Sequence, residues 1–464
     1  MIANEGAIKM DEAWAPYTPT PEAPWDRRRV VHLHRRAGLA ATWEEAERDL
    51  ADGPEASVSR LLDGKSRAYG VPTDFDSTAS LLADAAVASN DPARLKAWWF
   101  YRMMFGPDPL GERLTLMWHD HFATSNLKVD NLAAMKRQNE LFRTHGRDRF
   151  ATLLGAVVHD PALLIWLDAP ANRKGHPNEN LARELMELFT LGIGHYTEPD
   201  IKEAARALTG WTLNDGAFRP VATRHDPGEK SILGRKGTWS GDDLLKILLE
   251  QPAAAEHLAK RLCRTFLGEK SADAAAIASL AEFLRRNQLD IGKAVATILR
   301  SRRFFDESNI QARVLGPIEY VLGPIRAFEM LDPPPSTLVL ADWAARLGQD
   351  LFYPPNVGGW PGGRGWLSSR AVIGRANFAA SLVDGRGIGR PTPVDLLVLA
   401  EQHERARDRD GVIAFCGELL LGSPPSQAWH DRIAAALGPD SSWGPDLARR
   451  AAALIVASPE AQLQ

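Results

Sequence analysis

Cysteine is nearly absent from the sequence. Only Cys263 and Cys416 occur among 464 residues, which is too few for a disulfide scaffold or a sulfur-rich metal site. Both lie in apolar stretches with helical spacing, and free cysteine is among the residue types most often buried. We therefore expect two buried thiols.

Long apolar runs are absent as well. No stretch approaches the ~20 apolar residues that a transmembrane helix needs. The first residues are polar and acidic, and the Arg35-Arg36 pair precedes the start of an amphipathic helix instead of the apolar core of a signal peptide. The sequence therefore predicts a cytoplasmic protein without a membrane span.

Neither sign of charge dominates the chain. The formal net charge is -4 at pH 7, and lysine and arginine gather only in short local runs. Such a chain has no overall field that would attract phosphate backbones or anionic lipid, so nucleic acid is not an expected partner. The hydrophobic share of 45% is that of an ordinary globular protein, which excludes disorder for most of the chain.

Strand signals are scarce, whereas helix signals recur along the chain. Thr42 and Glu45 form a capping box, and Asp91 and Asp160 are capping residues that are each followed by proline. Apolar residues with helical period follow these caps. Residues 214–241 are the main exception, because pairs of turn-forming residues interrupt them. The sequence predicts a mainly α, multi-helical globular domain with a short β-hairpin insertion.

Composition also divides the chain into segments. Residues 1–24 are rich in proline, alanine and glutamate and are expected to form a flexible arm. Residues 25–384 form the predicted helical main domain, residues 385–393 a glycine- and proline-containing linker, and residues 394–464 a small helical C-terminal lobe.

A long segment, YPPNVGGWPGGRGWLSS at residues 353–369, is too rich in glycine and proline for a helix or a strand. Loops of this length are uncommon in compact domains unless they bind or cover something. Trp360 and Trp366 lie in this loop, whereas most of the 14 tryptophans are expected in the core. We interpret the loop as a lid or pocket wall, with both rings as candidate binding residues for a sugar or an aromatic ligand.

The segment from Asn178 onward is the richest in site-like residues. Asn178 is a good N-cap for a helix that buries leucines at helical spacing. Asn180, Glu184 and Glu187 are four and three residues apart, so they share one face where the carboxylates can converge. This spacing suits a metal-ligand pair or two acids with different pKa values. The alternative is a solvated face on which Arg183 and Glu187 form an ordinary ion pair.

A second group contains His119 and His121, in the sequence MWHDHF. Histidines two positions apart share a side on a strand, but on a helix they diverge by about 200°. Because the flanking apolar residues have helical spacing, we expect at most one imidazole to reach a given site. A core histidine bonded to a main-chain carbonyl is the competing interpretation.

A third group, His225 and Asp226, lies in the predicted hairpin region. A histidine with an adjacent aspartate can supply a base and its orienting carboxylate, or the aspartate can form an Asx turn, which is the more frequent case. No phosphate-binding loop, dinucleotide fingerprint, nucleophile elbow or HExxH zinc motif is present. The familiar cofactor classes are therefore unsupported.

Six blocks of sequence resemble the large bacterial domain-of-unknown-function family eighteen hundred (DUF1800). The likeness runs from about His32 to Ser381 and includes the following blocks: HLHRRAG at residues 32–38, MWHDHF at 117–122, NRKGHPNENLARELMELFTLG at 172–192, YTEPDIKEAARALTGW at 196–211, HDPGEKSILG at 225–234 and FYPPNVGGWPGG at 352–363. The resemblance implies a mostly helical domain with a shared polar site. It also implies a sulfatase-like partner protein, and relatives are often exported, whereas this sequence shows no signal peptide.

The resemblance carries no established activity. The positions that it marks as site residues are His119, His121, Asn180, Arg183, Glu184, Glu187, Arg206, His225 and Asp226. We expect a hydrolase or related acid/base enzyme in which Glu184 and Glu187 work with His119 or His121, and Arg183 holds an anion or tunes a carboxylate.

Two alternatives remain open for the same residues. In one, His119, His121, Glu184 and Glu187 bind a divalent metal, because mixed histidine and carboxylate sets suit zinc, manganese or iron. In the other, the protein is a non-catalytic binding or assembly protein whose polar groups form a buried network that fixes helix packing.

Overall fold

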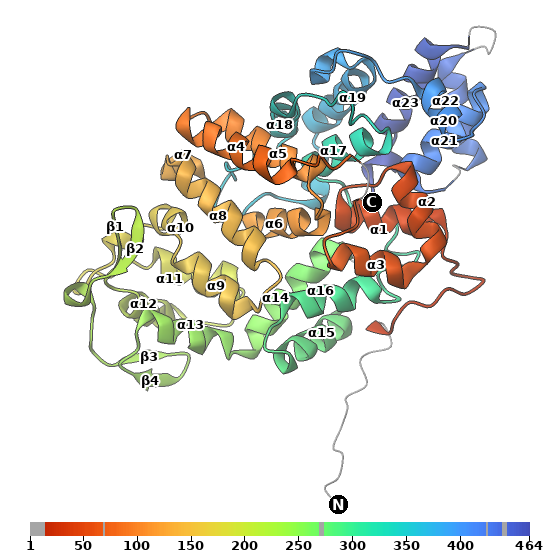
Figure 1. Ribbon diagram of the computed structural model, residues 1–464. Helices are drawn as coiled ribbons and strands as arrows, with labels where there is room; N and C mark the ends of the chain where they lie inside the picture. Colours follow the sequence, from red (N-terminus) through yellow and green to blue (C-terminus); the bar gives the residue numbers. More distant parts are fainter. Residues whose placement is uncertain (1–13, 68–69, 269–272, 424–425, 439–442) are drawn as a thin grey trace, which may run out of the picture. The chain divides into compact units, whose positions relative to one another are not determined.

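The computed structural model describes residues 14–67, 70–268, 273–423, 426–438 and 443–464. Within these ranges the chain is mainly helical, with helices α1 to α23 and two small antiparallel strand pairs (Figure 1). The predicted fold class, a multi-helical protein with a short β insertion, is confirmed. No described helix has both the length and the apolar character that crossing a membrane requires.

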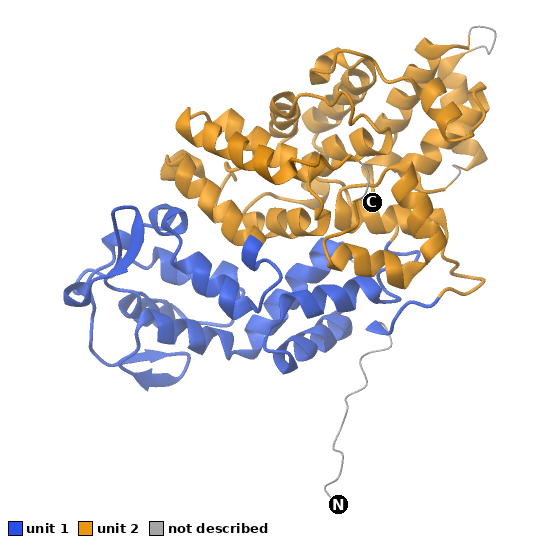
Figure 2. Ribbon diagram, viewed as in Figure 1, with its two compact units in different colours: residues 1–18, 144–309 blue, residues 19–143, 310–464 orange. Residues whose placement is uncertain are grey.

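The chain divides into two compact units, each formed from two separate segments (Figure 2). Unit 1 comprises Met1–Thr18 and Thr144–Asn309, and unit 2 comprises Pro19–Arg143 and Ile310–Gln464. Each is described by itself below. Part of the predicted N-terminal arm, residues 1–13, lies outside the described residues.

Unit 2 contains the first and last thirds of the chain. Its helices are α1 (Arg27–Gly38), α2 (Trp43–Asp52), α3 (Pro54–Leu62), α4 (Phe75–Ala88), α5 (Pro92–Phe105), α6 (Pro109–His121), α7 (Asn126–Val129), most of α8 (Leu132–His145), α17 (Pro317–Ala327), α18 (Thr337–Arg346), α19 (Ser369–Asp384), α20 (Leu396–Gln402), α21 (Arg409–Leu421), α22 (Gln427–Leu437) and α23 (Pro445–Ala457). The unit also contains the short 3-10 helices η5 (Gly363–Leu367), η6 (Arg386–Ile388) and η8 (Glu460–Gln462). Consecutive helices α4 and α5 pack together, and so do helices from distant parts of the sequence: α5 lies against α18, α19 against α23, and α1 against α21.

Unit 1 contains the middle third. Its helical elements are α9 (Phe150–Val158), α10 (Pro161–Trp166), η2 (Ala169–Ala171), α11 (Asn180–Glu184), the π-helix η3 (Leu185–Thr190), α12 (Glu198–Ala207), η4 (Ala222–Arg224), α13 (Gly241–Leu249), α14 (Pro252–Phe266), α15 (Ala274–Arg286) and α16 (Ile291–Arg300). Trp14 is buried in this unit, where its indole N–H donates to the carbonyl of Ala276 at 3.0 Å.

The β insertion consists of two hairpins instead of one. Strand β1 (Trp211–Asn214) pairs with β2 (Ala217–Pro220), and β3 (Lys230–Ile232) pairs with β4 (Arg235–Gly237), both antiparallel. Asp215 and Gly216, which connect β1 to β2, have φ values of 51° and 71°. A two-residue hairpin turn with positive φ at both positions favours this residue pair, so the turn signal in the sequence has a direct structural cause.

Helix starts follow the capping residues that the sequence indicates. Thr42 and Glu45 form the predicted capping box of α2, and Asp91 and Asp160 accept main-chain N–H groups at the starts of α5 and α10. Both cysteines are buried, as expected, and burial raises the pKa of each thiol to about 12. Such thiols stay protonated at neutral pH, which agrees with a packing role.

Candidate functional site

The predicted site residues fall on both units. Unit 1 carries Asn180, Arg183, Glu184, Glu187, Arg206, His225 and Asp226, whereas unit 2 carries His119, His121, Trp360 and Trp366. Each unit therefore carries its own group of candidates, and each group is described by itself.

The glutamate helix of unit 1 changes type at its centre. Helix α11 ends at Glu184, and the chain continues as the π-helix η3. Leu181 and Leu185 of the predicted apolar stripe are buried, but Leu188 is only partly so. A π-helix has more residues per turn than an α-helix, so different positions are buried after Leu185. Regular α-helical spacing therefore does not describe residues 185–190.

Side chains stabilise the π-helix by bonding its carbonyls. The Thr190 hydroxyl donates to the carbonyl of Leu185 at 2.5 Å, and His257 Nε2 donates to the carbonyl of Leu188 at 2.8 Å. π-Helical turns are rare and are frequently found at functional sites, where they change the direction of a side chain. Here the change begins directly after Glu184 and includes Glu187.

Glu184 and Glu187 interact electrostatically. The half-buried Glu184 has a raised pKa, because burial disfavours its charged form and the Glu187 carboxylate repels it, while Arg183 opposes both effects. The Tyr196 hydroxyl donates to Glu187 Oε2 at 2.6 Å. Tyr196 is not one of the site residues predicted from the sequence. Two glycines before it, Gly192 and Gly194, have positive φ and allow the chain to turn after η3. These glycines are the sequence feature that indicates a turn near Tyr196.

The remaining polar residues of this helix have partners of their own. Arg183 forms a two-pronged ion pair with Glu198, at 2.8 and 2.9 Å, and a weaker contact with Glu179. The Asn180 side chain contacts Asp168 at 3.4 Å, and its main-chain N–H donates to the side chain of the preceding Asn178 at 2.9 Å. The Asn178 side chain thus accepts a main-chain N–H group, as a capping residue does, although the helix itself begins at Asn180.

Arg206, His225 and Asp226 belong to a neighbouring network. Arg206 Nε donates to Asp226 Oδ2 at 2.8 Å, and the N–H of Gly228 donates to Asp226 Oδ1 at 2.9 Å. His225 Nδ1 donates to the carbonyl of Thr209 at 3.0 Å. The bond from Gly228 is an Asx turn, which supports the turn interpretation over that of a catalytic histidine–aspartate pair.

In unit 2, His119 is buried among aromatic rings. Its ring centroid lies 5.3 Å from that of Trp99 and 5.5 Å from those of Phe352 and Trp360. Its Nε2 accepts the main-chain N–H of Phe352 at 3.1 Å, and burial lowers its pKa to about 4, which Asp120 only partly opposes. His119 is therefore neutral at pH 7 and forms a hydrogen bond to the main chain within the core. The competing interpretation from the sequence is a bond to a main-chain carbonyl, whereas the partner here is a main-chain N–H group.

The other unit 2 candidates are also buried. His121 contacts Trp118 and Phe122, so the two imidazoles of α6 face different rings, in agreement with helical divergence. Trp360 and Trp366 are each 6% exposed. Asp120, which the sequence reasoning did not include, accepts the N–H of Trp360 at 2.8 Å and so holds the glycine-rich loop against α6.

Among the residues that the structure describes, no group of three or more histidine, cysteine, aspartate or glutamate side chains could hold a metal ion. The metal-ligand set of His119, His121, Glu184 and Glu187 stays a prediction from sequence, and it draws on both units.

Comparison with known proteins gives a family but no function. A family model described as "Protein of unknown function (DUF1800)" matches residues 32–463. No curated protein and no solved structure matches the chain. The resemblance seen in the sequence is thus confirmed, and the match extends beyond Ser381 through helices α20 to α23.

Proposed function

The chain belongs to the DUF1800 family, and we propose that it is a hydrolase-type enzyme whose acid and base are Glu184 and Glu187 of unit 1. The observation that carries the proposal is the pair itself. Two carboxyl groups interact at the start of a π-helix, the pKa of Glu184 is raised, and Glu187 receives a tyrosine hydroxyl. Carboxyl pairs with unequal environments are a recurring basis for acid/base catalysis.

The environments suggest a role for each group. Glu184 has the raised pKa, so it holds a proton to higher pH and serves as the general acid that protonates a leaving group. Glu187 is oriented by Tyr196 and serves as the base that takes a proton from water. Arg183, engaged by Glu198, tunes the pair through its charge. The proposed substrates are small molecules, with carbohydrates as the first class to test.

A turnover screen tests this function. Nitrophenyl glycosides, esters and phosphates are assayed with the full chain, and any activity is compared with that of Glu184→Gln. Loss of an acid/base group typically reduces the rate by about 10²–10⁴-fold. Glu198→Gln is the matched control, because Glu198 is an exposed glutamate that forms an ion pair with Arg183. It should retain the rate to within about tenfold, corresponding to ~1.4 kcal/mol.

A non-catalytic binding or assembly role is the second candidate. The ion pairs Arg183–Glu198 and Arg206–Asp226 are the kind of polar contacts that fix helix packing. A sulfatase-like protein, implied by the family resemblance, is the proposed partner in that case. Failure of every substrate class, together with a loss of stability in Glu184→Gln, would favour this candidate over the enzyme.

A further inference from the structure

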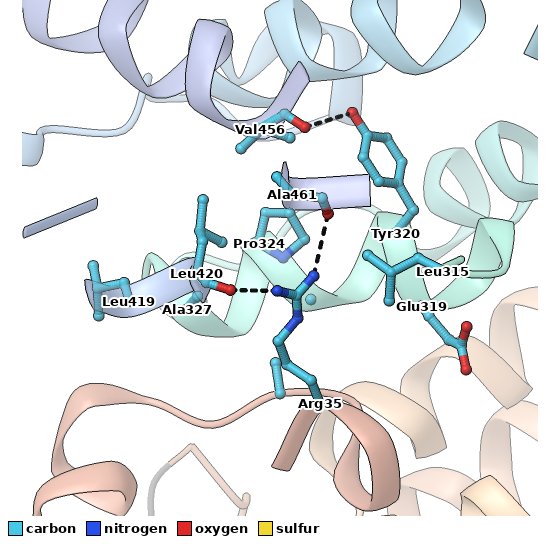
Figure 3. Close-up of a pocket in the computed structure, with 12 residues that line it drawn as sticks. Arg35, Leu315, Glu319, Tyr320, Pro324, Ala327, Leu419, Leu420, Val456 and Ala461 are labelled. Carbon is cyan, nitrogen blue, oxygen red and sulfur yellow. Dashed lines mark hydrogen bonds between the residues drawn. The ribbon is translucent and has the colours of Figure 1, made fainter. Parts of the chain in front are cut away.

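The hollow among α1, α17, α21, α23 and η8 of unit 2 is too small for a ligand, because it has room for about one water molecule. The guanidinium of Arg35 at this hollow already donates to the main-chain carbonyl oxygens of Leu420 and Ala461 (Figure 3). The clearest binding feature lies instead on the surface of unit 1, beside the hairpin of β1 and β2.

Two short segments of unit 1 expose four cationic side chains. Residues 172–177 contribute Arg173 and Lys174, and residues 217–224 contribute Arg219 from strand β2 and Arg224 from η4. Neither segment contains an aspartate or a glutamate. These four residues are called the basic patch below.

Main-chain hydrogen bonds hold the two segments together. The N–H of Lys174 donates to the carbonyl of Arg224 at 2.8 Å. The N–H of Gly210 donates to the carbonyl of Asn172 at 3.1 Å, and the N–H of Val221 donates to that of Gly210 at 2.8 Å. Gly210 has a φ of +86°, and a Cβ there would lie 2.7 Å from the Val221 carbonyl oxygen, so this close approach requires glycine.

The first segment is also fixed by bonds of its own. The main chains of Arg173 and His176 pair as a β-bridge, and Gly175 between them has a φ of +81°. The buried side chain of Asn172 donates to the carbonyl of Ala205 at 2.8 Å. The main chain below the patch is thus ordered before a partner arrives, which reduces the entropy lost on binding.

The charges of the basic patch lack counter-ions in the protein. All four side chains are exposed, and within the described residues none of them forms an ion pair. The carboxylate that follows each segment is committed elsewhere, since Glu179 contacts Arg183 at 3.2 Å and Asp226 pairs with Arg206 at 2.8 Å. A fixed group of unpaired positive charges complements a partner surface that carries negative charge.

We propose that the basic patch binds an acidic segment of a partner protein, with aspartate or glutamate side chains on its cationic groups. Three of the four residues are arginine, whose planar guanidinium takes a carboxylate in two-pronged geometry. The whole chain has a net charge of -4, so a long polyanion such as nucleic acid would meet repulsion beyond the patch, whereas a short acidic segment would not. This interaction does not depend on whether Glu184 and Glu187 are catalytic.

Fluorescence anisotropy of the full chain with a fluorescein-labelled peptide of alternating glutamate and glycine tests the proposal. The wild type should bind this peptide at an ionic strength of ~0.1 M, and binding should weaken as salt is added. The double variant Arg173→Glu with Arg224→Glu should bind at least about tenfold more weakly, because each exposed ion pair contributes up to ~5-fold and the reversed charges repel the peptide.

The matched control is the double variant Arg285→Glu with Arg286→Glu. It makes the same change of charge on α15, which lies at the other end of unit 1 from the hairpin of β1 and β2 (Figure 1), at two arginines that already pair with Glu282. This control should bind the peptide within about twofold of the wild type, because charges farther apart than ~10 Å are screened at that salt concentration.

Cross-linking with a carbodiimide, which joins a carboxylate to an amine in contact, locates the peptide on the wild-type protein. The amide should form at Lys174 in preference to Lys246, an exposed lysine of α13. This measurement needs no variant, so it decides even if the patch variant fails to fold.

Three results would overturn the proposal. The first is no binding of the peptide by the wild type, and the second is equal binding by the wild type and the patch variant or equal cross-linking at Lys246. Either would leave the four side chains as an ordinary solvated surface. The third is an oligothymidylate that binds the patch more tightly than the peptide, which would assign the surface to nucleic acid instead of an acidic protein segment.

Discussion

The main-chain N–H of Trp360 donates a hydrogen bond of 2.8 Å to Oδ1 of Asp120, the residue between the two histidines of α6. His119 accepts the N–H of Phe352 at 3.1 Å from the same helix end. Two neighbouring side chains of α6 thus bind the main chain at the start and in the middle of the glycine- and proline-rich loop. The stretch from Phe352 to Trp360 is therefore fixed against α6 by side chain to main-chain bonds.

The first prediction concerns the carboxylate of Asp120. Asp120→Ala should reduce the free energy of unfolding by about 1–3 kcal/mol, since the partly buried N–H of Trp360 loses a charged acceptor. Asp120→Asn retains an oxygen at the same position and should cost less. Chemical denaturation monitored by tryptophan fluorescence measures both. Equal losses in the two variants would contradict the role of the oxygen acceptor.

Gly359 gives the second prediction. Its φ is +80°, and a Cβ there would lie 2.3 Å from Asp120 Oδ1 and 2.6 Å from the Asp120 carbonyl oxygen. Gly359→Ala should therefore destabilise the fold by more than the ~1 kcal/mol that a positive φ costs alone, because the loop must also move away from α6. Gly358→Ala is the control, since the nearest atom to its Cβ is 3.1 Å away and belongs to the side chain of Asn356. Thermal unfolding should separate the two, and similar melting temperatures would argue against close packing at Gly359.

The sequence predicts the helices, the capping residues and the turn at Asp215-Gly216 because those features depend on neighbouring residues. The π-helix is different. Its distinguishing bonds come partly from His257, far along the chain from Leu188, so spacing within the helix cannot reveal it. The regular α-helical wheel therefore describes the residues up to Glu184 and misplaces those after Leu185.

The two histidines and the loop tryptophans show the same limit in unit 2. Helical spacing predicts that His119 and His121 diverge, and they do. The composition of the loop predicts a pocket wall, but composition does not report whether its side chains are buried. Trp360 packs against His119, a contact between residues that are distant in sequence. Only the fold brings these rings together.

The third prediction uses the stability of Glu184→Gln at neutral pH. The folded-state pKa of Glu184 is raised, so ionised Glu184 opposes folding once the pH exceeds the unfolded-state pKa. Glutamine removes that charge, and the variant should be as stable as the wild type or slightly more stable at pH 7. Below pH 4 the difference should vanish, because Glu184 is then protonated in both states. Thermal melts across this range provide the measurement, and a clear loss of stability at pH 7 would instead support a structural network.

The fourth prediction concerns His119, which should make the protein less stable as the pH falls, whereas Glu184 should make it less stable as the pH rises. Its folded-state pKa is lowered to about 4 by burial, while the unfolded value is near 6.5. As the pH falls from 6.5 towards 4, the unfolded chain takes up a proton that the folded protein does not, so stability decreases. The full effect of that difference is about 3 kcal/mol. His119→Gln should flatten the stability profile in this window, as measured by denaturation at several pH values. A profile as steep as that of the wild type would assign the acid sensitivity to other groups.

The last prediction concerns the buried ion pair between Glu45 and Arg326 in unit 2. Arg326 donates to both Glu45 oxygens, at 2.9 and 2.8 Å, and both side chains are almost fully buried. Burial would raise the pKa of Glu45, but Arg326 and His34 outweigh it, with help from the Thr42 N–H, and the pKa falls to about 2.

The sign of the pH effect follows from that pKa. The stabilisation by Glu45 is fully present above the unfolded-state value near 4.5 and is lost as the pH falls towards 2. Arg326→Met should therefore cost about 3–5 kcal/mol at pH 7, because it leaves a buried carboxylate without its partner. The double variant Glu45→Gln with Arg326→Met should recover part of that loss, since no unpaired charge remains. Guanidinium denaturation of the single and double variants measures the coupling, and additive losses would show that the two side chains act independently.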